Sequence, residues 1–231
     1  MLRQWDRLPT YMKTPEVRPY WEELYNKRIY FVLKRFFDVI LALFLLVIFL
    51  IPMIVISILI KLDSPGTIFY RQERVTTYGE HFRIHKFRTM VMNAETMGTS
   101  VTIEDDNRVT SIGEKLRRFR LDEIPQIFDV LEGSMSFVGT RPEAVKYVEK
   151  YKPEYNATLL LPAGITSEAS IRFKDEDKLL SSECDADEVY MEKILPRKME
   201  INLYSLHKAS LKNDLCTMIR TIFAVLGKEY K

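Results

Sequence analysis

The feature that most constrains this chain is a run of 22 residues, 39–60, without a charged side chain. As a helix it would be about 33 Å long, enough to cross a bilayer core of about 30 Å. Pro52 lies inside the run, where it removes a backbone hydrogen bond and bends a helix. Three alternatives follow: a spanning helix, a re-entrant helix that bends at Pro52 and leaves by the face it entered, and a buried core helix.

The charge balance narrows the choice of partners. The chain has 34 basic and 32 acidic residues, a formal net charge of +2. Nucleic-acid-binding domains are usually strongly basic, so no nucleic-acid partner is expected. Lys34 and Arg35 precede the apolar run and Lys61 follows it, and such flanking cations attract anionic membrane lipids. Because both flanks are basic, they do not orient the helix. The sequence leaves the oligomeric state open: a homodimer is compatible with it, but no residue argues for one.

The remaining patterns predict a mainly helical α+β domain. Residues 68–75 and 79–88 read as two strands of a small β-hairpin. The C-terminal residues 196–226 read as one long amphipathic helix, which either packs on the body or lies in the membrane interface. The other expected elements are an irregular segment over residues 1–20 and helices over residues 21–38, 112–121, 125–132 and 143–151.

Two smaller patterns each leave a metal site and an ordinary surface as alternatives. His81 and His85 are four residues apart, but on a strand they lie too far apart for a tight pair, which favours surface histidines. Asp105 and Asp106 lie in a polar segment, where a solvated turn is favoured because hard cations need several oxygens held together.

A dense charge cluster carries the chemistry. Arg117, Arg118 and Arg120 precede Asp122 and Glu123. A carboxylate can attack phosphorus and form an acyl phosphate, provided that cations screen its charge from an anionic substrate. The helix expected to begin at position 125 adds a helix N-terminus, which suits a phosphate. The alternative is that the two carboxylates only complement the helix dipole and pair with the arginines.

Several motifs occur together in a recognisable order. They are Lys34-Arg35-Phe36-Phe37-Asp38, Gln72-Glu73-Arg74-Val75, Lys86-Phe87-Arg88-Thr89-Met90, Leu121-Asp122-Glu123-Ile124-Pro125-Gln126 and Ser136-Phe137-Val138-Gly139-Thr140-Arg141-Pro142. On these motifs the chain resembles the bacterial sugar transferases, the monotopic phosphoglycosyl transferases, from about residue 34 to the C-terminus. Residues 1–33 have no counterpart.

The resemblance implies a reaction and a place in the cell. A UDP-sugar donor gives its sugar-1-phosphate to a polyprenyl phosphate, usually undecaprenyl phosphate, and UMP is released in the first membrane step of glycoconjugate synthesis. The implied cofactor is Mg²⁺. The implied architecture is an N-terminal extension (1–33), a re-entrant membrane helix broken near Pro52 (34–62) and a catalytic domain (63–231) on the cytoplasmic face of the bacterial inner membrane.

The resemblance also implies residue roles. Asp122 would be the nucleophile and metal ligand, and Glu123 would handle the proton of the lipid phosphate. Arg117 would hold phosphate and Arg141 the nucleotide. Three further residues would also bind substrate: Lys86, Arg88 and Pro142.

Some residues depart from the family pattern. Thr140 stands where the family usually has proline, and residues 167–173 differ from the family sequence. A rival hypothesis from another class is a catalytically silent membrane-anchored module that binds anionic lipid head groups.

Overall fold

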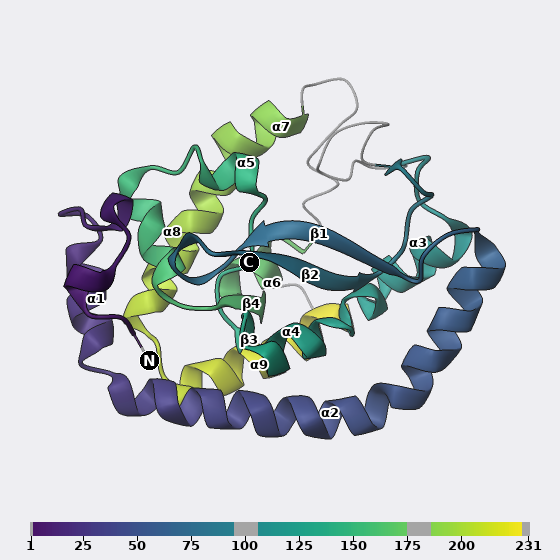
Figure 1. The fold of residues 1–231 in the computed structure, drawn as a ribbon, viewed down its shortest axis with the longest axis horizontal. Coiled ribbons are helices and arrows are strands. Elements are labelled where there is room, and N and C mark those ends of the chain that lie inside the picture. Colours follow the sequence, from purple (N-terminus) through teal and green to yellow (C-terminus); the bar gives the residue numbers. More distant parts are fainter. Residues whose placement is uncertain (1, 95–105, 175–185, 228–231) are drawn as a thin grey trace.

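The computed structural model describes residues 2–94, 106–174 and 186–227, which form a mainly helical body with two two-stranded sheets (Figure 1). The helices are α1 (Arg18–Tyr25), α2 (Arg28–Asp63), α3 (Ser111–Arg118), α4 (Gln126–Glu132), α5 (Val145–Val148), α6 (Glu168–Arg172), α7 (Ala186–Val189), α8 (Leu195–His207) and α9 (Leu211–Val225). The strands are β1 (Phe69–Val75), β2 (His81–Phe87), β3 (Met135–Val138) and β4 (Ala163–Thr166). Single turns of 3₁₀-helix are η1 (Trp5–Arg7), η2 (Thr10–Met12), η3 (Thr77–Gly79) and η5 (Leu121–Glu123); η6 (Pro153–Leu160) is longer, and η8 (Tyr190–Ile194) is π-helical.

The apolar run lies in α2, which is longer than expected. This helix has 36 residues, begins at Arg28 and continues through Pro52. The expected helix over 21–38 is therefore wrong, because α1 ends at Tyr25 and the first turns of α2 belong to the apolar helix. A break at Pro52 is not found either: α2 changes direction in its second half without an interruption (Figure 1).

One face of α2 lies against the body and the rest is exposed. The buried residues recur at helical spacing: Lys34, Asp38, Ala42, Met53, Ile56 and Ile60. Most of the other large apolar side chains of α2 are exposed, Val47 and Leu62 among the most exposed. Among the described residues, α2 alone is long and apolar enough to cross a membrane.

The predicted hairpin is confirmed. Strands β1 and β2 pair in antiparallel register around the turn η3, with Phe69 opposite Phe87 and Val75 opposite His81. Tyr78 at the turn has a positive φ of 59°. The pairing places Lys86 opposite Tyr70, one residue before the end of β2. Strand β2 contacts η5, the turn that contains Asp122.

A second sheet was not expected from the sequence. Strands β3 and β4 pair in parallel, with Ser136 beside Gly164 and Val138 beside Thr166. The segments around Gly139 and Gly164 come so close that a Cβ on Gly164 would lie 2.2 Å from the backbone nitrogen of Gly139. Glycine is required here because any side chain would push the two segments apart.

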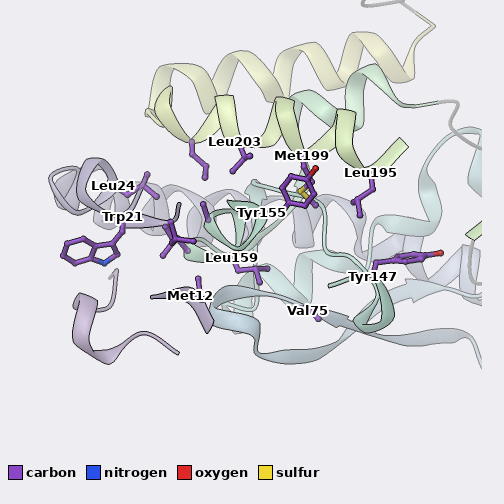
Figure 2. Packing of buried hydrophobic residues seen from close by; sticks show 14 of the residues in the cluster. Met12, Trp21, Leu24, Val75, Tyr147, Tyr155, Leu159, Leu195, Met199 and Leu203 are labelled. Atoms are coloured by element: carbon purple, nitrogen blue, oxygen red, sulfur yellow. The ribbon is translucent and has the colours of Figure 1, made fainter. Parts of the chain in front are cut away.

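The N-terminal extension is part of the main core. Met12 and Val17 are fully buried, and Leu24 nearly so. They pack against residues of η6 and α8, among them Leu159 and Met199 (Figure 2). Burial of such side chains contributes roughly 1.5–3 kcal/mol each, so the extension stabilises the domain to which it is joined.

The single C-terminal helix predicted over 196–226 is wrong. The chain forms α8 and α9, separated at positions 208–210. Ser210 caps α9 by accepting a hydrogen bond from the Asn213 backbone nitrogen at 3.3 Å, the usual role of serine before a helix. Helix α8 packs into the main core, whereas α9 exposes Leu215, Ile222 and Phe223. The expected helix over 143–151 is also shorter, because α5 spans only Val145–Val148.

Candidate active site

The backbone places Asp122 and Glu123, hereafter the dyad, in a tight turn before a helix. Arg120 has a left-handed conformation, with φ 55°, and η5 follows at once. Pro125 precedes α4, and Gly133 ends it with φ 96°. Proline at a helix start and glycine just past its end are the residues that these positions favour. The predicted helix limits are confirmed here.

Glu123 is held by two cations from other elements. Lys86 of β2 lies 3.0 Å from Glu123 Oε1, and Arg141 forms an ion pair with the same carboxylate. Burial would favour the neutral acid, but Arg141 and Lys86 hold the pKa of Glu123 well below its ordinary value. Glu123 is therefore ionised and fully engaged in the described structure.

Asp122 is in the opposite situation. Its side chain is 8 % exposed, and its buried Oδ1 has no hydrogen-bond partner. Burial, with the neighbouring charge of Glu123, raises the pKa of Asp122, although Lys86, Arg117 and Arg120 partly offset this. A buried oxygen without a partner costs free energy, which the fold tolerates where a ligand completes the site.

The alternative in which the dyad only pairs with the preceding arginines is not what the described residues show. Glu123 pairs with Arg141 and Lys86, which are remote in sequence. Arg117 donates through Nε to Thr89 Oγ1 at 2.9 Å, and Arg120 donates to the Lys174 carbonyl at 2.7 Å. The dyad is thus built by tertiary structure.

The other predicted substrate-binding residues divide into two groups. Lys86 and Arg141 converge on Glu123, and Arg117 acts electrostatically on Asp122 from α3. Arg88 is not brought to the dyad: its buried guanidinium donates to the carbonyls of Ser64 and Pro65 at 2.7 and 2.8 Å.

Pro142 is buried beside Arg141, and its carbonyl accepts from Arg74 at 3.5 Å. It contributes to the path of the backbone next to Arg141. A direct contact of Pro142 with substrate remains a prediction.

The structure separates the two histidines that the sequence favoured as surface residues. His81 is exposed, whereas His85 donates from its backbone nitrogen and shares a ring-nitrogen hydrogen bond with buried Asp129, at 2.9 and 2.8 Å. His85, Asp129 and Glu132 are close enough to hold a metal ion, but the Asp129 oxygens are already used to join β2 to α4.

The acidic pair at 105 and 106 can be described only in part. Asp105 lies outside the described residues. Asp106 forms an ion pair with Arg108 at 2.6 Å, and it accepts hydrogen bonds from the Arg108 backbone nitrogen and Nε at 3.0 and 2.8 Å. This local pairing agrees with the turn that the sequence favoured.

Sequence reasoning missed a group of polar residues behind Arg141. Arg74 is half-buried beside Pro142, and loss of solvent around its guanidinium lowers its pKa. Glu143, Tyr190 and Lys198 form a buried hydrogen-bonded group. Arg74 was quoted within a motif and Glu143 follows Arg141-Pro142 directly, but no local pattern links them to Tyr190 or Lys198.

The chain belongs to the bacterial sugar transferase family, whose model matches residues 29–228. It is 33% identical over 201 residues to the UDP-N-acetylgalactosamine-undecaprenyl-phosphate N-acetylgalactosaminephosphotransferase of Aeromonas hydrophila, covering 86% of this chain and 44% of that protein. It is 34% identical over 197 residues to the UDP-glucose:undecaprenyl-phosphate glucose-1-phosphate transferase of Escherichia coli K12, covering 83% of this chain and 40% of that protein.

A shorter relative is an exopolysaccharide production protein of Rhizobium leguminosarum, 36% identical over 148 residues, with 61% of this chain and 74% of that protein covered. The chain thus spans less than half the length of the Aeromonas and Escherichia relatives.

Proposed function

We propose that this chain transfers a sugar-1-phosphate from a UDP-sugar to undecaprenyl phosphate in membrane polysaccharide synthesis. The observation that carries the proposal is the dyad, in which one carboxylate is held by cations and the other is buried with an unpartnered oxygen. Family membership and the names of the relatives support the same reaction.

The chemistry takes two displacements at one phosphorus. The Asp122 carboxylate forms a bond to the sugar-linked phosphorus while that atom's bond to the bridging oxygen breaks, and UMP leaves. An oxygen of undecaprenyl phosphate then attacks the same phosphorus, the bond to Asp122 breaks, and the free carboxylate returns. A covalent intermediate divides one difficult displacement into two easier ones.

Binding of the donor can change the pKa of Glu123, because the donor competes for the two cations that pair with this carboxylate. Arg141 and Lys86 are the groups that a diphosphate would attract, since paired anionic oxygens suit a guanidinium and an ammonium. If they turn to the donor, Glu123 loses the charges that hold its pKa low. Its pKa then rises, and Glu123 becomes able to accept the proton of the lipid phosphate.

The dyad also fits a magnesium ion. Mg²⁺ is bound by one or two carboxylates together with substrate phosphates, and Asp122 Oδ1 is a buried carboxylate oxygen without a partner. Asp122 would hold the ion, which when bound would neutralise phosphate charge. Glu123 offers less to a metal because Lys86 and Arg141 already occupy it.

The start and the end of α2 both contact the same body, which supports a re-entrant arrangement, and we propose that this body lies on the cytoplasmic face. Near its start Lys34 pairs with Asp214 of α9 at 2.8 Å. At its end Asp63 accepts from the Ile112 backbone nitrogen of α3 at 3.1 Å. A straight spanning helix would separate these ends by the thickness of the bilayer, so only a bent helix keeps both contacts.

The test of activity is UMP release by the full chain in nanodiscs. UDP-N-acetylgalactosamine and UDP-glucose are supplied with Mg²⁺ and undecaprenyl phosphate, beside Asp122→Asn. We expect release that requires the lipid and is lost in the variant. Folded protein that binds anionic vesicles but releases no UMP would instead support the silent lipid-binding module.

The test of topology is labelling in intact cells. With Cys184 and Cys216 replaced by serine, a cysteine is placed at exposed Glu16 or exposed Glu149, on either side of α2 in the chain. A membrane-impermeant reagent should label neither site until the inner membrane is permeabilised. Labelling of one site alone in intact spheroplasts would show that α2 spans the membrane.

A further inference from the structure

A buried polar network lies behind the Arg141 loop. Tyr190 of η8 donates to Glu143 Oε1 at 2.7 Å, and Lys198 of α8 donates to the Tyr190 hydroxyl at 2.9 Å. Lys198 also lies 3.4 Å from Glu143 Oε1, which closes the triangle. All three side chains are buried, with Lys198 only 3% exposed.

This network is joined to the rigid core of the domain. In the sequence of α8, Lys198 falls between Leu195 and Met199, and the side chains of those two residues pack into the main core (Figure 2). The backbone of Glu143 is held by β1, because the Glu143 carbonyl accepts a hydrogen bond from the Val75 backbone nitrogen at 3.1 Å. The Glu143 side chain and backbone are therefore held by α8 and by β1 at the same time.

Glu143 lies two residues after Arg141, so the network fixes one end of a three-residue segment. At the other end Arg141 reaches Glu123 of the dyad. The intervening Pro142 restricts the backbone, and its carbonyl accepts from Arg74 at 3.5 Å. A shift of Glu143 would therefore move the Arg141 guanidinium relative to the dyad.

The charge of Glu143 also acts on the two arginines beside it, Arg74 and Arg141. Arg74 and Arg141 repel one another, whereas Glu143 attracts both. Burial opposes the charge of Glu143, but Lys198, Tyr190 and Arg74 hold its pKa below the ordinary value. An ionised Glu143 thus offsets the repulsion between these two guanidiniums.

A buried ion pair is poor evidence of stability, because desolvation of the charges offsets much of their attraction. A fully hydrogen-bonded network does fix geometry, since each partner has one satisfied arrangement. We propose that Glu143, held by Tyr190 and Lys198, is a positioning residue that aligns Arg141 and Arg74 for the diphosphate of the nucleotide-sugar donor. This inference rests on the proposed transferase function.

The test separates donor binding from chemistry. Glu143→Gln and Tyr190→Phe are assayed for UMP release with whichever of UDP-N-acetylgalactosamine and UDP-glucose the wild type uses. We expect the KM for the donor to rise about tenfold, with the KM for undecaprenyl phosphate unchanged. Donor binding is also measured in the Asp122→Asn background, where an Arg141→Met substitution should reduce the effect of Glu143→Gln, because part of that effect acts through Arg141.

The chain supplies a matched control. Asp214 also accepts from a tyrosine and a lysine, Tyr30 at 2.9 Å and Lys34 at 2.8 Å, but at the junction of α2 and α9. Asp214→Asn should lower the thermal midpoint and leave the donor KM unchanged. Equal donor KM values in Glu143→Gln and wild type, or an equal rise in Asp214→Asn, would overturn the inference. Absence of UMP release by the wild type would instead overturn the proposed function.

Discussion

Two buried carboxylate clusters of this protein differ in how completely they are paired. The α2 anchor comprises Tyr30, Lys34, Asp38 and Asp214. In it Asp38 accepts from the Ser136 hydroxyl at 2.8 Å and from the Phe137 backbone nitrogen at 3.3 Å. In the dyad, Asp122 keeps a buried oxygen without a partner. Burial and charge are common to both clusters, so the oxygen without a partner is what distinguishes the dyad from the α2 anchor.

The largest expected effect comes from exchanging one carboxylate in each cluster. Asp122→Asn should lower UMP release by about a thousandfold or more, because the amide cannot form the acyl phosphate. Its thermal midpoint should stay or rise, since a buried charge is removed. Asp38→Ala should do the reverse: a loss of about 1–3 kcal/mol in stability from two unpaired donors, with turnover per folded molecule within a few-fold. A large loss of turnover in Asp38→Ala would erase the distinction between the clusters.

The anchor can be tested by removing its cation. Lys34→Met leaves Asp214 with Tyr30 alone and should lower the thermal midpoint by about 5–10 °C in nanodiscs. The double variant Lys34→Met/Asp214→Leu should recover most of the loss, because the carboxylate that Lys34→Met leaves without its cation is removed as well. A double variant as unstable as the single one would mean that packing rather than charge pairing holds α2 to α9.

The dyad should give stability a distinctive pH dependence. The folded state raises the pKa of Asp122, so it binds that proton more tightly than the unfolded chain does. Stability from this group therefore falls as pH rises from its ordinary pKa through the raised one. The thermal midpoint of Asp122→Asn relative to wild type should increase by a few degrees between about pH 4 and pH 7.

Glu123 acts in the other direction, because its folded pKa is lowered. Its contribution is present above its ordinary pKa and is lost as pH falls toward the folded pKa. Glu123→Gln should therefore lose stability relative to wild type as pH rises toward the ordinary glutamate pKa of about 4.3, and the difference should level off above it. Parallel curves for the two variants would show that the carboxylates are not differently charged.

The smallest expected effect concerns an exposed cation. Arg120 is one of the charges that lower the pKa of Asp122. Arg120→Gln should move the acid limb of UMP release to higher pH by about a few tenths of a unit, since an exposed charge is largely screened by water. Arg120→Lys keeps the charge and should leave the limb in place. A shift in the lysine variant as well would assign the effect to the hydrogen bond with Lys174 instead of charge.

Local residue patterns account for part of this structure. The hairpin follows from two strand-forming segments around a turn, and the limits of α4 follow from Pro125 and Gly133. The division of the C-terminal segment also had a signal, because Ser210 is a good helix cap that the apolar spacing concealed. The parallel pair β3 and β4 had none, since its strands are only four residues long and lie far apart in the chain.

The apolar helix and the hairpin were predictable from the sequence because each depends on residues that are neighbours in the chain, and the family resemblance singled out Asp122 and Glu123. Tertiary structure alone decided which cations serve the dyad. Lys86 and Arg141 reach Glu123, whereas Arg88, two residues from Lys86, turns away to Ser64 and Pro65. Ion pairing depends on the distance between charges in the folded protein and on their burial, and neither can be derived from the order of the residues.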